Sequence, residues 1–137
     1  MITKLKRVAI FLTAISTASI PAMAHADWSI KGLGFLGEWA SRYSQSVATD
    51  INDSGQVVGY STKSSGFSLF ITGPNGVGMT DLGINSLDDP SINNSGQVAG
   101  TFHYSDGRPH AFITSPNGIG ITDLGTFGGS QSAGTGI

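Results

Sequence analysis

The chain has 137 residues, with 7 basic and 9 acidic side chains, 20 glycines and no cysteine. Beyond the first seven residues, the four remaining basic side chains are scattered, which argues against the clustered Lys and Arg of a nucleic-acid-binding face. Without cysteine there are no disulfides, so stability must come from packing and strand pairing. The many glycines favour frequent turns over long helices.

The first 26 residues differ from the rest of the chain. A basic start is followed by an apolar, uncharged run over residues 8–18 and by two overlapping A-x-A motifs that end at Ala24 and Ala26. This order predicts a secretory signal peptide over residues 1–26, and the apolar run is too short to span a membrane. We therefore expect an exported protein, extracellular or periplasmic, whose mature domain covers residues 27–137.

The mature part should be acidic and free of membrane spans. Cleavage removes three of the seven basic residues, which leaves 4 − 9 = −5 as the net charge. No second apolar stretch of about 20 residues follows, so no membrane-spanning segment is expected.

Two tandem copies of one motif fill the mature part. Residues 53–59, Asp-Ser-Gly-Gln-Val-Val-Gly, return at residues 94–100 as Asn-Ser-Gly-Gln-Val-Ala-Gly, an offset of 41. Residues 70–83 return at residues 112–125 with an offset of 42, and most of these positions are identical. Self-similarity at such a fixed period indicates a supersecondary unit that stacks on its own copies.

Turn residues divide the first unit into four strand candidates. These are residues 46–51, 56–62, 67–72 and 77–82. Proline presets φ in the turn Pro74-Asn75-Gly76, and Asn-Gly tolerates positive φ. All the turns are short, so neighbouring strands should pair antiparallel.

The sequence therefore predicts an all-β fold of tandem four-stranded antiparallel meanders. Such a meander, recurring at this spacing, is the unit of a β-propeller blade. Units at about 44–83 and 90–125, with partial copies at both ends, would make an incomplete propeller, and a small β-sandwich is the alternative. Open sheet faces and edges recruit other chains, so self-association is expected.

The second unit resembles the repeat of the HAF family of bacterial extracellular proteins. The matching segments are Ile92-Asn93, Gly-Gln-Val-Ala-Gly at 96–100, His-Ala-Phe at 110–112, Asp-Leu-Gly-Thr at 123–126 and Gly-Gly-Ser at 128–130. The first unit departs from the family's naming tripeptide, with Ser68-Leu69-Phe70 in its place. The resemblance implies an exported, propeller-like protein, and it carries over no catalytic residue.

One turn has the spacing of a calcium loop. Asp50, Asn52 and Ser54 alternate before Gly55, as oxygen ligands do around Ca²⁺. The second unit has Ser91 in place of Asp50, however, and a distal bidentate glutamate is missing. We therefore interpret the segment as a hairpin turn and assign no metal ligand.

Histidines and carboxylates supply the other candidate chemistry. His103 and His110 flank a hairpin without a third ligand, so ordinary strand histidines are expected. Asp88-Asp89 and Glu38 lie in loops between units, where a propeller glycosidase could place its carboxylates. Two adjacent exposed aspartates usually only solvate a loop, so we assign neither a catalytic nor a cofactor-binding residue.

Two further sets of residues have different expected roles. Asp81 and Asp123 recur at the same turn, which predicts carboxylates that accept hydrogen bonds from nearby backbone N–H groups. Trp28 and Trp39 fall outside the repeated core. Trp39, beside Tyr43, is the candidate for a sugar-stacking or partner contact, the alternative being an aromatic folded onto the sheet.

These features together predict a noncatalytic extracellular or cell-surface repeat module, with a structural or interaction role and an uncharacterised ligand. Two alternatives from other classes remain. The chain could be a truncated fragment of a longer propeller-type repeat protein, or a carbohydrate-active enzyme for which no carboxylate pair can be named.

Overall fold

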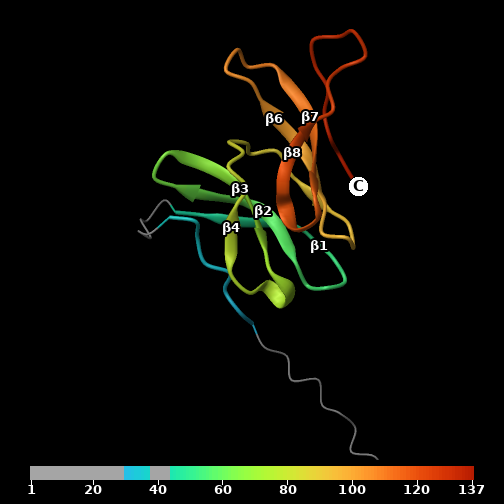
Figure 1. The fold of residues 1–137 in the computed structure, drawn as a ribbon. Helices are drawn as coiled ribbons and strands as arrows, with labels where there is room; N and C mark the ends of the chain where they lie inside the picture. The colour runs from blue at the N-terminus through green and yellow to red at the C-terminus, as the bar shows by residue number, and fades with distance from the viewer. Residues whose placement is uncertain (1–29, 38–43) are drawn as a thin grey trace, which may run out of the picture. The chain divides into compact units, whose positions relative to one another are not determined.

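The computed structural model describes residues 30–37 and 44–137 (Figure 1). The signal peptide expected over residues 1–26 lies outside the described residues, as do Trp28, Glu38, Trp39 and Tyr43. No helix of the described part is long and apolar enough to cross a membrane.

Two four-stranded antiparallel sheets make up the fold, and the all-β prediction is confirmed. The first sheet contains β1 (Ser46–Ile51), β2 (Val57–Lys63), β3 (Gly66–Thr72) and β4 (Met79–Asp81). The second contains β5 (Ser91–Ile92), β6 (Val98–His103), β7 (Pro109–Ser115) and β8 (Ile119–Asp123). Both sheets follow chain order, so each is a meander.

The turn before the last strand of each unit has the conformation that its residues predict. Pro74–Gly76 and Pro116–Gly118 each form a short 3-10 turn, η1 and η2. The asparagine at the centre is left-handed in both, with φ of 56° at Asn75 and 62° at Asn117. Gly78, two residues after η1, also has a positive φ of 67°. β4 begins at Met79 rather than at residue 77, as the sequence predicted.

A glycine lets β1 lie close to β2. Gly59 pairs with Ala48, and the register shifts between Ala48 and Asp50 at a bulge. A Cβ added at Gly59 would lie only 1.9 Å from the carbonyl oxygen of Val47. Only glycine therefore fits at this position without separating the two strands.

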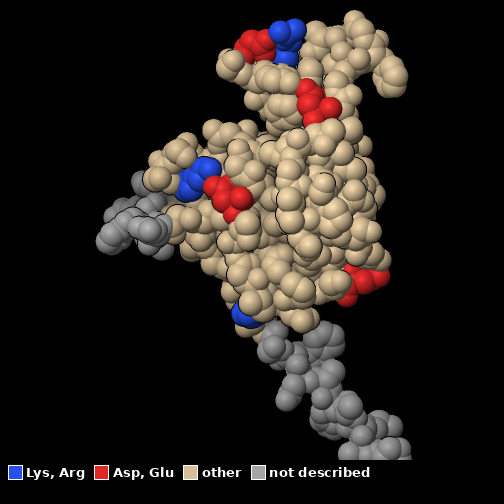
Figure 2. Space-filling model, in the orientation of Figure 1, with Lys and Arg blue, Asp and Glu red and all other residues tan. Residues whose placement is uncertain are grey.

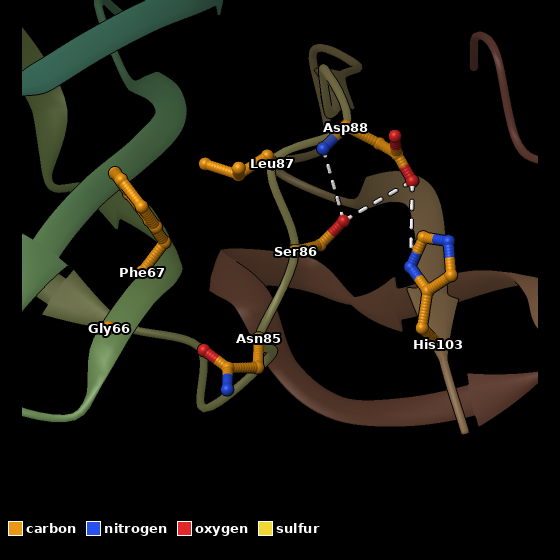
Figure 3. A pocket seen from close by; sticks show the side chains of 7 residues that line it. All are labelled: Gly66, Phe67, Asn85, Ser86, Leu87, Asp88 and His103. Atoms are coloured by element: carbon orange, nitrogen blue, oxygen red, sulfur yellow. Dashed lines mark hydrogen bonds and ion pairs between the residues drawn. The ribbon is translucent and has the colours of Figure 1, made fainter. Parts of the chain in front are cut away.

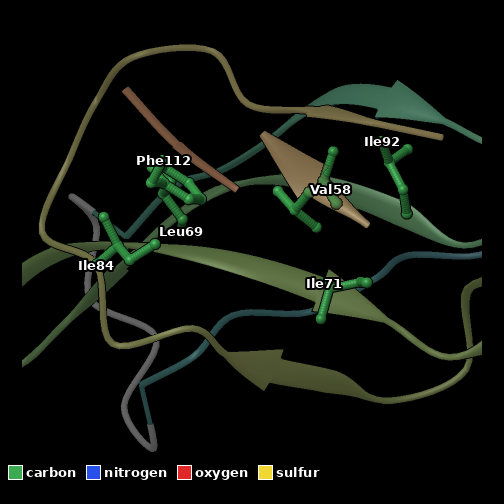
Figure 4. Packing of buried hydrophobic residues seen from close by; sticks show 7 residues of the cluster. Val58, Leu69, Ile71, Ile84, Ile92 and Phe112 are labelled. Atoms are coloured by element: carbon green, nitrogen blue, oxygen red, sulfur yellow. The ribbon is translucent and has the colours of Figure 1, made fainter. Parts of the chain in front are cut away.

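A single hydrophobic core joins the two sheets (Figure 4). Its buried members are Val58, Leu69, Ile71, Ile84, Ile92, Val98 and Phe112. The first three come from β2 and β3, the last three from β5, β6 and β7, and Ile84 from the connection between the units. The two sheets are thus two layers around a shared core, as in a small sandwich.

The two sheets contribute nonequivalent faces to this core. Val58 and Ile71 pair across β2 and β3, so they share one face of the first sheet. Val98 of the second sheet stands where the repeat has Val57 in the first, and Val57 points to the opposite face from Val58. The face of the first sheet that carries Val58 therefore packs on the face of the second sheet that carries Val98, and within the repeat these are opposite faces. Successive repeats stack in this head-to-tail manner, whereas a two-fold sandwich would join equivalent faces.

Polar contacts follow the same junction. Thr49 Oγ1 donates to the carbonyl oxygen of Pro90 at 2.7 Å. The Ile92 N–H donates to Asp50 Oδ2 at 2.9 Å. Asn52 Nδ2 donates to the carbonyl oxygen of its own repeat equivalent, Asn93, at 3.1 Å. The first hairpin turn of each unit is therefore bonded to its counterpart.

Candidate functional site

The aspartate at the end of each unit's last strand gathers a small polar cluster. In the first unit, Asp81 accepts hydrogen bonds from Lys63 Nζ at 2.8 Å, from the Ser68 hydroxyl, and from the Gly83 N–H at 2.7 Å. Lys63 ends β2 and Ser68 lies in β3, so the carboxylate ties the β2–β3 hairpin to the chain that leaves β4.

In the second unit the equivalent residue, Asp123, has different partners. Its carboxylate accepts the Tyr104 hydroxyl at 2.5 Å and the Gly125 N–H at 2.7 Å, and it lies 3.1 Å from His110 Nδ1. Tyr104 and His110 occupy the repeat positions of Lys63 and Ser68. The backbone hydrogen bond is thus common to both units, and the prediction that Asp81 and Asp123 bond nearby N–H groups is confirmed.

The hydrogen bonds in these two clusters shift the pKa values of Asp81, Asp123 and Tyr104. Partial burial raises the pKa of Asp81, but hydrogen bonds from Lys63, Ser68 and Gly83 outweigh it and lower the pKa below the ordinary 3.8. The hydrogen bond from Tyr104 is the main cause of the lowered pKa of Asp123, and the same bond raises the pKa of Tyr104. Both carboxylates are therefore ionised near neutral pH, and the tyrosine is protonated.

The second unit's hairpin forms a cleft beside the Asp123 cluster. The cleft has a volume of about 320 Å³ and is lined by Tyr104, Ser105, Asp106, Arg108 and His110. The Arg108 and Asp106 side chains are paired, with 2.7 Å from Nε to Oδ2. The rings of Tyr104 and His110 meet edge to face with centroids 4.8 Å apart. An aromatic ring beside paired polar groups can contact a sugar or a peptide, through stacking and hydrogen bonds together.

A larger cleft lies between the β2–β3 hairpin and the connection to the second unit (Figure 3). Its volume is about 440 Å³, and its lining residues are Gly66, Phe67, Asn85, Ser86, Leu87, Asp88 and His103. Phe67 and Leu87 form an apolar side, and Asp88 faces His103 with 3.8 Å between Oδ2 and Nδ1. Asp88 Oδ2 also accepts the Ser86 hydroxyl at 3.3 Å.

The two histidines weighed as a metal pair have separate carboxylate partners. His103 lies beside Asp88, and His110 lies beside Asp123. Among the described residues, no group of three or more His, Cys, Asp or Glu side chains is placed to hold a metal ion.

In the turn that has calcium-loop spacing, the side-chain oxygens accept hydrogen bonds from backbone N–H groups. The two carboxylate oxygens of Asp50 accept the N–H groups of Ile51 and Ile92 at 2.8 and 2.9 Å. Asn52 Oδ1 accepts the N–H groups of Ser54 and Gln56 at 3.1 and 3.0 Å. These bonds are those of an Asx-type hairpin turn, which supports the interpretation made from the sequence.

Charged side chains are few on the surface, and they occur in small groups on an otherwise uncharged face (Figure 2).

Sequence reasoning did not identify Tyr104 and Arg108 as candidates. The available signal was the repeat itself, because Tyr104 replaces Lys63 opposite an aspartate that recurs in both units, and the hairpin around Tyr104 is longer than in the first unit.

Comparison with protein-family models, curated proteins and solved structures finds no match to this chain.

The Asp81 cluster should make stability depend on pH. Because the pKa of Asp81 is lower in the folded state, its contribution is complete above the unfolded value near 3.8 and is lost as pH falls through the folded pKa. We expect Asp81→Asn to lower the free energy of unfolding near pH 7 by about 1 kcal/mol, since it loses partly exposed hydrogen bonds. Urea titrations between pH 7 and pH 2 measure both effects.

Asp89→Asn is the matched control, because Asp89 makes no hydrogen bond or ion pair with the described residues. It should leave stability at pH 7 unchanged. If Asp81→Asn has the same pH dependence as the parent chain below pH 4, the Asp81 carboxylate does not stabilise the hairpin.

Proposed function

We propose that the protein is an exported, noncatalytic repeat module that binds an extracellular or cell-surface ligand through its second-unit hairpin. The observation that carries this proposal is a difference between the units. The hairpin of the second unit is one residue longer than that of the first, since the repeat offset rises from 41 before it to 42 after it, and it carries Tyr104, Asp106 and Arg108. A repeated scaffold that varies in one exposed hairpin is typical of recognition modules, whose binding residues lie in loops on a rigid framework.

The state of the carboxylates supports a noncatalytic role. Glycoside hydrolysis needs a carboxylic acid with a raised pKa opposite a second carboxylate. Among the described residues, the carboxylates whose pKa values shift, at Asp81, Asp106 and Asp123, all have lowered pKa values. Most aspartates of the described part are also engaged by hydrogen bonds within the fold. These are Asp50, Asp53, Asp81, Asp88, Asp106 and Asp123.

Export is supported by the order of basic, apolar and A-x-A elements in residues 1–26, and by the resemblance of the second unit to HAF-family repeats. We expect N-terminal sequencing of the secreted protein to begin at His25 or Asp27. A secreted form that still begins at Met1 would contradict cleavage.

Ligand binding is tested by screening the secreted protein against a glycan array and a panel of chromogenic glycosides. We expect binding without hydrolysis, and a loss of at least about tenfold in affinity for Tyr104→Ala, because a buried sugar–ring contact contributes on the order of 1.4 kcal/mol or more. Ser64→Ala, in the short hairpin of the first unit, is the control and should bind normally. Release of chromophore from any glycoside would favour the carbohydrate-active enzyme instead.

A further inference from the structure

A Leu-Gly pair marks the junction between successive units. The pairs are Leu33-Gly34, Leu82-Gly83 and Leu124-Gly125, and their glycines share a left-handed φ of 86°, 72° and 67°. Leu82 lies over the bare glycine of η2, since a Cβ added at Gly118 would come within 2.6 Å of Leu82 Cδ2. Leu33 lies in the same way over Gly76 of η1, at 3.0 Å. Leu124 is 59% exposed.

Two polar positions show the same difference between the units. In the first unit, the buried Asn52 and Gln56 reach across the junction, and Gln56 Nε2 donates to Asn117 Oδ1 at 3.2 Å. Their equivalents in the second unit, Asn93 and Gln97, are half-buried. Asn93 Nδ2 donates to Gln97 Oε1, within its own turn. Gln97 Nε2 reaches only the carbonyl oxygen of Thr114 in the neighbouring strand, at 3.5 Å.

Asn93, Gln97 and Leu124 therefore form a donor face, defined as the three positions whose first-unit equivalents dock on the next unit. The matching acceptor face consists of the asparagine and glycine of the Pro-Asn-Gly turn, together with the carbonyl oxygen of the hairpin-turn asparagine, which in the second unit accepts from Asn52. The second unit's acceptor residues, Asn117 and Gly118, are occupied by the first unit. The first unit's acceptor residues, Asn75 and Gly76, have the same left-handed backbone.

We propose that two copies of this chain dock head to tail, with the donor face of one copy on the acceptor face of the other. The junction inside the chain supplies the template, because it already joins these residue types with nonequivalent faces. Leu33 covers Gly76 in the single chain, so docking must displace Leu33 from the turn. The intrachain contact of Leu33 with Gly76 therefore competes with the intermolecular contact of Leu124 with Gly76, and this competition weakens association.

Cross-linking tests the orientation directly, since the chain has no cysteine of its own. Leu124→Cys marks the donor face, and Val77→Cys marks the acceptor face beside Gly76, where the side chain is exposed. With a short bis-maleimide, head-to-tail docking gives cross-linked dimers when the two full-length variants are mixed, and little when either is alone. Dimers from Leu124→Cys alone would indicate a two-fold contact and overturn the proposal, as would the absence of mixed dimers.

Sedimentation equilibrium of the full chain over a concentration series measures the strength of docking. We expect Leu124→Asp to weaken association at least tenfold, and Leu33→Ala to strengthen it. Leu87→Asp is the control for an exposed leucine off the donor face, and it should leave association unchanged. Equal association of Leu124→Asp and the parent chain would overturn the proposal. Glycan binding at the Tyr104 hairpin should survive Leu124→Asp, so the ligand proposal and the docking proposal fail separately.

Discussion

Replacing Phe112 with alanine is expected to lower the free energy of unfolding by about 3–5 kcal/mol, the usual range for a fully buried phenylalanine. Phe112 has no exposed surface and belongs to the cluster that joins the two sheets. Its ring lies against Gly100, where an added Cβ would be 3.0 Å from Cε1. Truncation removes these contacts and leaves a cavity where the second sheet meets the first. Urea denaturation followed by circular dichroism measures the change.

Phe127→Ala removes the same atoms from an exposed site. The Phe127 side chain is 112% exposed, so its loss should change stability by less than about 0.5 kcal/mol. A loss below about 1 kcal/mol for Phe112→Ala would mean that the two sheets do not share one core. A second unfolding transition of the Phe112→Ala variant, at a lower urea concentration, would show that the units unfold separately.

The second large effect is expected at the buried turn asparagine of the first unit. Asn52 Oδ1 accepts two backbone N–H groups, and Nδ2 donates to Gln56 Oε1 and to the carbonyl oxygen of Asn93. Alanine leaves all of these groups without their partner, two of them in a buried setting and two in a partly buried one. At roughly 0.5–1.5 kcal/mol for each hydrogen bond, Asn52→Ala should lower the free energy of unfolding by about 2–4 kcal/mol.

Asn93→Ala is the matched variant, because Asn93 makes the same bonds within its own turn but donates to no other unit. We expect it to cost less than Asn52→Ala by about 1 kcal/mol or more, a difference that isolates the bond across the junction. Equal losses would show that the Asn52–Asn93 contact does not contribute to stacking. Both variants are measured in the same urea titration.

The two polar clusters share one backbone hydrogen bond and differ in their side-chain partners. Asp81 and Asp123 each accept the N–H of the left-handed glycine two residues ahead, Gly83 or Gly125. The partners on the hairpin side are free to differ, as Lys63 and Tyr104 do. The repeated carboxylate therefore keeps its backbone hydrogen bond while its side-chain partners differ between the units.

The sequence by itself determined the elements and their order. Strands expected at residues 46–51 and 67–72 lie at 46–51 and 66–72, and the Pro-Asn-Gly turn takes the left-handed asparagine that its composition implies. Turn chemistry is local: glycine and asparagine set φ, and short connections leave only antiparallel neighbours. The backbone role of Asp81 and Asp123 was also accessible, because the position recurs at the same turn in both units.

Only the tertiary structure decided which faces meet. Leu69 and Phe70 are consecutive in β3 and both fully buried, so alternation along the strand does not distinguish a core face from an outer face. The pairing of Tyr104 with Asp123 and the bond from Asn52 to Asn93 join residues 19 and 41 positions apart. Such contacts depend on hairpin register and on the stacking of one unit against the next. Local propensity does not predict the hairpin register or the stacking, because both are set by the burial of surfaces that are distant in the chain.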